Sequence, residues 1–318
     1  MGTSPPWPER VSDARSYLVR RGHVDPIVAV STPTGRHHAG DVAARCEIGS
    51  VTKVFTALLL AVLARSGEVR LHDRLPGLLP PGTRLAPGVD GITLENLASH
   101  RSGLPRLPPG VIPLSVSRSS RVDPYADVDS DRLIGALART RLRGAPGDAP
   151  VRYSNFGAGL LGLLLGRATG LGFEESLMTC VIAPLGLTAT SFADQPLRQG
   201  RHRGRDVPPW HLAAMAGAGG LRAPARDLLT FLESVRDGGG PLEESIAETV
   251  RPRSERGPVR VGLGWFLLGG GEVLLHDGGT LGARSEVRLE RHSGTAVVIL
   301  GDGRRGTARA ASMLLTPR

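Results

Sequence analysis

Residues 47–57 of the chain read Glu47-Ile48-Gly49-Ser50-Val51-Thr52-Lys53-Val54-Phe55-Thr56-Ala57. Ser50 stands directly before an apolar run, 51–65, whose composition and length predict a helix that ends at Gly67. Residues three apart on a helix share one face, so Ser50 and Lys53 are expected to be hydrogen-bond neighbours. Among the 39 lysine and arginine residues, Lys53 is the only lysine. Because lysine, unlike arginine, can lose its proton and act as a base, the pair predicts a nucleophilic serine beside its activating amine.

A simpler interpretation of the same stretch is structural. In it, Ser50 is only the N-cap of the helix, and Lys53 is only a surface residue of the first turn. A lysine in the first turn opposes the helix dipole, which weakens this interpretation. The free N–H groups of a helix N-terminus instead favour the negative charge that develops when Ser50 attacks a carbonyl.

A second candidate motif is Tyr153-Ser154-Asn155, in a chain that has three tyrosines. A tyrosine beside a lysine ammonium can have its pKa lowered and then serve as a base. An asparagine at this place supplies an amide donor toward Lys53 or toward a substrate carbonyl. The alternative is that Ser154 or Asn155 caps the helix that follows, and both uses are compatible.

The third motif is His276-Asp277-Gly278-Gly279-Thr280, at the end of a predicted strand. Its glycines would let a substrate approach the backbone closely. Asp-Gly is also the commonest sequence of a hairpin turn, and the motif taken alone favours a turn.

Strand patterns occur at both ends of the chain and helix patterns between them. The expected strands are 27–31, 43–48, 261–268, 272–276, 284–290 and 295–301. The expected helices are 12–21, 51–65, 94–99, 130–141, 156–169, 173–182, 225–236 and 307–315. This order predicts an α+β fold, in which an antiparallel sheet built from both termini is flanked by helices and carries a mainly helical inserted lobe. We expect a single domain, 1–318, with a sheet lobe at about 1–70 and 254–318, a helical lobe at about 71–253, and a small-molecule site in the groove between them.

Composition excludes several other classes of function. The net charge of +9 is carried almost wholly by arginine, but the arginines are scattered and no nucleic-acid-binding motif accompanies them. The densest basic run, 201–205, is expected to be a solvated loop. Cys46 and Cys180 lie in apolar surroundings and indicate core residues rather than a disulfide framework. The nine histidines show no metal-ligand spacing, so we expect no metal, no cofactor and no nucleic-acid partner.

The first 21 residues contain prolines, acids and arginines but no apolar segment of the kind found in signal peptides. The most apolar stretches, 54–64 and 160–165, are too short to span a bilayer. We therefore expect a cytoplasmic protein without a membrane partner. Nothing in the sequence indicates its oligomeric state.

The three motifs, in this order and with a helical insert between the first two, resemble those of the serine β-lactamase-like superfamily. The similar branch holds class C β-lactamases, DD-peptidases and related esterases. Further segments also resemble this branch, at 97–105, 184–192, 219–221, 226–228 and 262–265. The third motif falls where the family places K-T-G or its H-x-G variant.

The resemblance implies roles for the candidate residues. Ser50 would be the acylated nucleophile and Lys53 the group that activates it. Tyr153 would be the partner base that passes the proton to the leaving group, and Asn155 would orient Lys53 and the substrate. The backbone N–H groups of Ser50 and Gly279 would form the oxyanion hole.

His276 would support the Tyr153 hydroxyl, or a carboxylate or carbonyl of the substrate. A tyrosine at the second motif argues against the class A branch, and a histidine at the third motif weakens the family's cationic carboxylate clamp.

These roles predict a serine-dependent acyl-enzyme hydrolase that acts on a small ester or amide. One alternative is an acyltransferase of specialised metabolism, in which an alcohol or amine replaces water in the second half-reaction. Another is a non-catalytic binding protein on the same fold.

Overall fold

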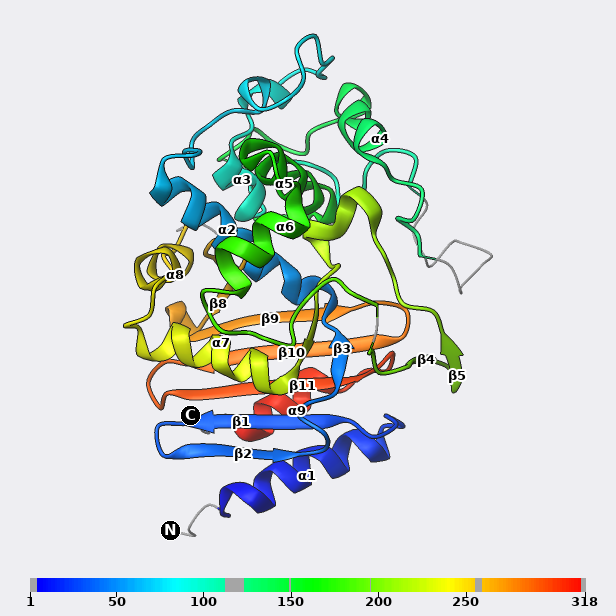
Figure 1. The fold of residues 1–318 in the computed structure, drawn as a ribbon, viewed down its shortest axis with the longest axis vertical. Helices are drawn as coiled ribbons and strands as arrows, with labels where there is room; N and C mark the ends of the chain where they lie inside the picture. Colours follow the sequence, from blue (N-terminus) through cyan, green and yellow to red (C-terminus); the bar gives the residue numbers. More distant parts are fainter. Residues whose placement is uncertain (1–4, 112–122, 149, 195, 255–258, 316–318) are drawn as a thin grey trace.

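The computed structural model of the protein describes residues 5–111, 123–148, 150–194, 196–254 and 259–315. Its centre is a seven-stranded antiparallel sheet in the order β2-β1-β11-β10-β9-β8-β7. The strands are β1 (Ile27–Thr32), β2 (Gly35–Ala39), β7 (Arg260–Val261), β8 (Phe266–Leu268), β9 (Val273–Gly279), β10 (Ala283–Glu290) and β11 (Thr295–Asp302). Because β1 pairs with β11, the two ends of the chain build one sheet, as predicted (Figure 1). The expected α+β class is confirmed.

Helices cover both faces of this sheet (Figure 1). On one face, α1 (Trp7–Arg20) and α9 (Thr307–Leu314) pack over the sheet. With β1 and β11 they form a separate apolar cluster, which consists of Val11, Ala14, Leu18, Val28, Val30, Val297, Ile299, Ala310, Ala311 and Leu314. On the other face, α7 (Ala225–Asp237) packs against β1, β10 and β11. Since β1 and β11 are covered on both faces, every residue in them is buried.

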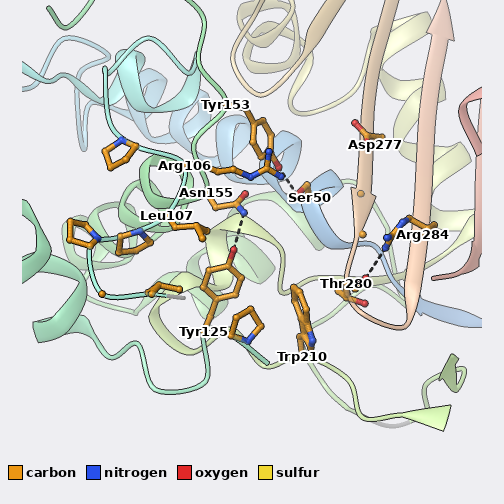
Figure 2. Close-up of a pocket in the computed structure, with 18 of the residues that line it drawn as sticks. Ser50, Arg106, Leu107, Tyr125, Tyr153, Asn155, Trp210, Asp277, Thr280 and Arg284 are labelled. Atoms are coloured by element: carbon orange, nitrogen blue, oxygen red, sulfur yellow. Dashed lines mark hydrogen bonds between the residues drawn. The ribbon is translucent and has the colours of Figure 1, made fainter. Parts of the chain in front are cut away.

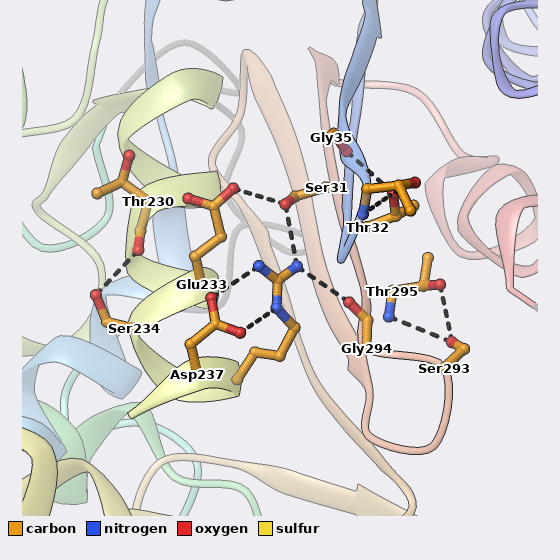
Figure 3. A network of polar contacts seen from close by, with 12 residues as sticks. Ser31, Thr32, Gly35, Thr230, Glu233, Ser234, Asp237, Ser293, Gly294 and Thr295 are labelled. Carbon is orange, nitrogen blue, oxygen red and sulfur yellow. Dashed lines mark hydrogen bonds and ion pairs between the residues drawn. The ribbon is translucent and has the colours of Figure 1, made fainter. Parts of the chain in front are cut away.

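Hydrogen bonds connect α7 to the end of β1 and to the turn between β10 and β11 (Figure 3). Ser31 of β1 donates to Glu233 of α7 over 2.6 Å. Arg236, one turn further along α7, donates to Ser31 Oγ and to the carbonyl oxygen of Gly294 in the turn between β10 and β11. One helix therefore holds two neighbouring strands in register.

The remaining helices form a layer beside the sheet, in the upper half of Figure 1. They are α2 (Thr52–Ser66), α3 (Leu94–Ala98), α4 (Ser130–Gly135), α5 (Asn155–Thr169), α6 (Phe173–Leu177) and α8 (Glu243–Thr249). Short 3-10 turns, among them Gly49–Val51 and Ala213–Ala218, connect them. The window Gly49–Ser66 is long and apolar enough to cross a membrane, but 72% of it is buried inside the protein, which explains its composition.

Glycines of α5 let another segment approach it closely. A Cβ atom on Gly162 would lie 2.9 Å from Gly217 Cα, and one on Gly159 would lie 2.5 Å from the sulfur of Met215. The 3-10 segment Ala213–Ala218 can therefore lie directly against α5. This close packing brings the backbone of Ala218 to the start of α2, where the candidate site lies.

Several strand predictions need correction. The expected strand 43–48 is shorter, β3 (Arg45–Glu47), and pairs with β6 (Arg222–Pro224) outside the main sheet. The expected strand 261–268 is a hairpin, β7 and β8, because the chain turns at Gly264, which has a φ of 73°. Strand β2 escapes prediction because its Gly-Arg-His-His-Ala sequence has no apolar alternation. The basic run 201–205 is not a loop but a hairpin, β4 (Gly200–His202) and β5 (Arg205–Val207).

The helical predictions differ mainly at boundaries. Helix α1 starts at Trp7 rather than at residue 12, with Pro6 as its N-cap and a proline in its first turn. Helix α8 is not predicted from the sequence. The expected lobe boundaries at residues 71 and 253 stay a prediction, and α7, which lies between them, packs against the sheet.

Candidate active site

Ser50 lies in the 3-10 turn that precedes α2, and two other candidate side chains converge on it (Figure 2). Lys53 Nζ lies 3.0 Å from Ser50 Oγ. The Tyr153 hydroxyl donates to the same oxygen over 2.6 Å. The convergence predicted from the sequence is therefore confirmed in its geometry, and Ser50 Oγ stands between an amine and a phenol.

The Lys53 side chain is buried, with 3% of its surface exposed. Besides Ser50, its amine contacts the carbonyl oxygen of Ala218, to which it donates over 2.5 Å. Burial lowers the pKa of Lys53 well below its usual range, and the nearby Arg106 guanidinium adds to this effect, while Asp277 opposes it. The neutral amine is therefore accessible at lower pH than for an exposed lysine. It can donate to Ala218 while its lone pair accepts a proton from Ser50.

Tyr153 does not have the lowered pKa that its position beside a lysine predicts. Its burial raises the pKa of the phenol, and this effect outweighs the hydrogen bond to Ser50 and the charge of Arg106. The nearest cations lie over its ring, with Lys53 Nζ 4.9 Å and the Arg106 guanidinium carbon 5.3 Å from the ring centroid. Tyr153 is therefore a protonated hydroxyl that donates to Ser50, and the lowered pKa that the sequence analysis allowed is not found.

His276 is fully buried behind the site rather than exposed in it. Its Nδ1 atom donates to the carbonyl oxygen of Asp277 over 2.7 Å, and its ring packs against Phe266 at a centroid distance of 5.5 Å. Burial lowers the pKa of His276 to about 3, with a further contribution from Lys53, so the imidazole is neutral. The His276 ring centroid lies 6.3 Å from that of Tyr153, and its Nε2 atom has no hydrogen-bond partner among the described residues, so the predicted hydrogen-bond support of the Tyr153 hydroxyl is not seen.

Asn155 is the first residue of α5, and Ser154 is the N-cap whose hydroxyl accepts from the Gly157 N–H. The Asn155 amide nitrogen donates to the Tyr125 hydroxyl over 2.9 Å (Figure 2). The Lys53 amine contacts the Ala218 carbonyl instead, and the described residues show no hydrogen bond between Asn155 and Lys53. The Asn155 amide oxygen is buried and has no partner among the described residues, and Asn155 lines the cleft.

The strand β9 passes directly beside the start of α2. A Cβ atom on Gly278 would lie 2.1 Å from the carbonyl oxygen of Ile48. One on Gly49, which has a φ of 48°, would lie 2.5 Å from the Gly279 nitrogen. Glycines on both sides thus bring the backbone of Gly279 against the residue that precedes Ser50. Asp277 and Gly278 pair with β10 inside β9, so this motif is not the turn that it favours when taken alone.

These residues lie at one end of a cleft of about 1070 Å³. Its wall includes residues that the sequence analysis does not select, among them Arg143 and, labelled in Figure 2, Arg106, Tyr125, Trp210 and Arg284. Arg106 directly follows the family-like segment 97–105, which is a signal that could have found it. Tyr125, Arg143 and Trp210 come from loops, where no periodic pattern marks them, whereas Arg284 lies at the start of β10.

Glu47 connects three segments that surround the cleft. This carboxylate is buried and accepts from the backbone N–H of Trp210 over 2.9 Å and from the Thr280 hydroxyl over 3.1 Å. It thereby connects the nucleophile segment, the Trp210 loop and the end of β9. Burial raises the pKa of Glu47, although both hydrogen bonds oppose this shift.

Comparisons with known proteins place the chain in a family. The family model described as Beta-lactamase matches residues 31–315. The D-alanyl-D-alanine-carboxypeptidase/endopeptidase AmpH of Escherichia coli is 32% identical over 193 residues, which cover 59% of this chain and 48% of that protein. Esterase EstB of Burkholderia gladioli is 29% identical over 254 residues, which cover 69% of this chain and 64% of that protein. The chain thus spans about half to two thirds of the length of these relatives.

Solved structures show the same fold. A class C beta-lactamase from Rhodobacter sphaeroides superposes with a TM-score of 0.79 at 20% identity, covering 96% of this chain and 98% of that one. A D-stereospecific amidohydrolase from Streptomyces sp. gives a TM-score of 0.78 at 22% identity, covering 98% of this chain and 99% of that one. With the family model matching nearly its whole length, the chain belongs to the beta-lactamase family, in the serine β-lactamase-like superfamily.

Proposed function

We propose that the protein is a serine hydrolase that cleaves a small ester or amide through an acyl-enzyme on Ser50. The observation that supports this most directly is the placement of Ser50 Oγ between the Lys53 amine and the Tyr153 hydroxyl, at the wall of an open cleft. The relatives named as an esterase, a carboxypeptidase/endopeptidase and an amidohydrolase are consistent with this class of reaction.

In the acylation step, the neutral amine of Lys53 takes the proton of Ser50 as Oγ attacks the substrate carbonyl carbon. The backbone N–H groups of Ser50 and Gly279 stabilise the oxyanion that forms. The bond to the leaving group then breaks. The leaving group receives a proton from the Tyr153 hydroxyl, which accepts in exchange the proton that Lys53 took.

In the deacylation step, water attacks the acyl carbon and gives one proton to the Lys53 amine, which passes it to Ser50 Oγ, directly or through the Tyr153 hydroxyl, as the acyl–oxygen bond breaks. Ser50 Oγ leaves and is protonated again, which restores the starting state. An alcohol or amine that replaces water would make the protein an acyltransferase by the same chemistry. Which acceptor reacts depends on how far the cleft excludes water.

The test is incubation of the protein with p-nitrophenyl acetate and butyrate, followed by intact mass spectrometry, with Ser50→Ala as the matched control. We expect a burst of p-nitrophenol and an acyl adduct on the wild type alone. Faster loss of the adduct in the presence of added alcohols or amines would favour the acyltransferase. A folded wild type that forms no adduct with any ester would favour the non-catalytic binding protein.

Two further expectations remain proposals. The partner is a small molecule that fits the cleft, and the site of action is the cytoplasm. Cell fractionation with an antibody to the protein would test the second, and recovery in a periplasmic or secreted fraction would contradict it.

A further inference from the structure

The motif His276–Thr280, at the end of β9, falls where the resembling family has K-T-G, but it offers no exposed cation to the cleft. His276, at the place of the lysine, is buried and neutral. The next residue, Asp277, places an exposed carboxylate on the cleft wall beside Tyr153 and Gly279. Among the described residues, the Asp277 side chain has no hydrogen bond or ion pair. The Asp277 carboxylate itself therefore repels an anionic group of a substrate, although the neighbouring Arg284 offsets part of its charge.

On the wall of β9 and β10, the cation that lines the cleft is Arg284, whose guanidinium donates to the carbonyl oxygens of Thr280 and Ala283. The opposite wall carries two further cations. Arg106 lies beside Tyr153 and Asn155, across the cleft from Asp277 (Figure 2). Its guanidinium carbon is 5.3 Å from the Tyr153 ring centroid, and its side chain is exposed. In the part of the chain that the structure describes, no carboxylate pairs with Arg106. The 5.3 Å separation from the Tyr153 ring places Arg106 close to the reacting atoms, and its charge contributes to the pKa shifts of both Lys53 and Tyr153.

Arg143 reinforces this wall. Its backbone N–H donates to the Gly103 carbonyl over 2.8 Å, and a Cβ atom on Gly103 would lie 2.5 Å from the Gly144 oxygen. The segment around Arg143 is therefore packed against the segment that leads into Arg106. Both arginines line the cleft, and Arg143 likewise has no acidic partner within the described residues. Two unpaired cations thus face the cleft from the helical side.

We propose that the substrate carries an anionic group, such as a carboxylate, and that Arg106 and Arg143 bind it on the wall opposite β9. This inference rests on the proposed acyl-enzyme function and names the substrate class of that site. A guanidinium matches a carboxylate in a bidentate geometry, and Arg106 would hold the anion beside the Ser50–Tyr153 pair. The Asp277 carboxylate would exclude the reverse orientation by like-charge repulsion.

The experiment compares three p-nitrophenyl esters of similar length: the monoester of adipic acid, the neutral hexanoate and the cationic 6-aminohexanoate. A second arm moves the charge to the leaving group, with 3-carboxyphenyl hexanoate against phenyl hexanoate. The readout is kcat/KM for the charged ester divided by kcat/KM for its neutral partner. This ratio separates recognition of the anion from any general effect of a substitution on acylation.

For the wild type, we expect the anionic ester to be preferred in at least one arm, and the arm that shows it places the anion on the acyl or the leaving-group side. Arg106→Gln should lower this ratio about tenfold or more, the effect of losing one charge-assisted contact. Arg143→Gln should lower it less, and Asp277→Asn should raise it. Arg167→Gln, an exposed arginine at the far end of α5, removes the same charge elsewhere and should leave the ratio unchanged.

Three results would overturn the inference while leaving the acyl-enzyme intact. They are a preference for the 6-aminohexanoate, anionic and neutral esters that react equally in both arms, and ratios that Arg106→Gln and Arg143→Gln do not change. Failure of every ester to acylate Ser50 would instead contradict the proposed function itself. The two failures are therefore distinguishable in one set of measurements.

Discussion

At the scale of single residues, Lys53 is the side chain on which the proposed chemistry depends most. Its amine contacts Ser50 Oγ and the Ala218 carbonyl in a buried site. We predict that Lys53→Arg abolishes the p-nitrophenol burst, by about 10²-fold to 10⁴-fold in the acylation rate, because arginine keeps the charge but cannot act as a base. Stopped-flow kinetics would measure the loss. Circular dichroism would show that the variant is folded, and an active, folded variant would refute the base assignment.

The two shifted pKa values predict a pH profile. The reactive form of Lys53 is the neutral amine, so the acylation rate should fall as pH drops below the lowered pKa of Lys53 and should level off at higher pH. Tyr153, whose pKa is raised, should remain protonated throughout. Burst rates measured from pH 5 to pH 10 would test this. A rate that keeps rising at the upper end of that range would point to a tyrosinate base.

Sequence predicts local contacts in this site better than distant ones. Helical spacing alone brings Ser50 and Lys53 together, because the two lie within one turn. The partner of Lys53 on its other side is a backbone carbonyl, that of Ala218, and a carbonyl has no side-chain signature in the sequence. The burial of His276 is equally hidden, since the same His-Asp-Gly letters fit an exposed or an inward-facing ring.

At the scale of elements, the site depends on the contact between β9 and the start of α2. We predict that Gly278→Ala reduces acylation by about 10²-fold or more. The added methyl would lie 2.1 Å from the Ile48 carbonyl oxygen and push β9, with the Gly279 N–H, away from Ser50. Gly135→Ala is the matched control, because nothing lies within 4 Å of a Cβ there. Wild-type burst kinetics in Gly278→Ala would show that this contact is not needed.

Elements with strong periodicity are predictable here, and irregular ones are not. Helix α5 and strand β11 match their expected ranges closely, since each buries a continuous apolar stretch. Strand β10 also matches, although charged residues alternate with apolar ones along much of it. The short hairpin of β7 and β8 reads as one strand in the sequence, because only the positive φ of Gly264 divides it. Strand β2 is polar and exposed at the sheet edge, so its pairing with β1 leaves no pattern.

At the scale of the whole molecule, the apolar cluster of α1, α9 and the outer face of the sheet lies on the opposite side of the sheet from α2 and α7. We predict that Leu18→Ala, at a fully buried position in this cluster, lowers the free energy of unfolding by about 2–5 kcal/mol. The acylation rate per folded molecule should not change. Urea unfolding and burst amplitude would be compared, and a large drop in the acylation rate would indicate coupling across the sheet.

The overall architecture is predictable because the strands expected at both ends of the chain need hydrogen-bond partners, and a shared sheet supplies them. The packing of α7 against the sheet cannot be predicted from the sequence, since its amphipathic pattern fits a helix in either layer. Its place is decided by contacts far apart in sequence, such as that of Glu233 with Ser31.

The burial of the single lysine makes it possible to follow local unfolding of this protein by proteolysis. A lysine-specific endoprotease can cut the printed chain at one peptide bond only, between Lys53 and Val54, inside the helix that carries the nucleophile. Both residues are buried, so the native protein should resist cleavage until α2 becomes exposed. The appearance of two fragments would then time the exposure of this one helix, without a label or an engineered site.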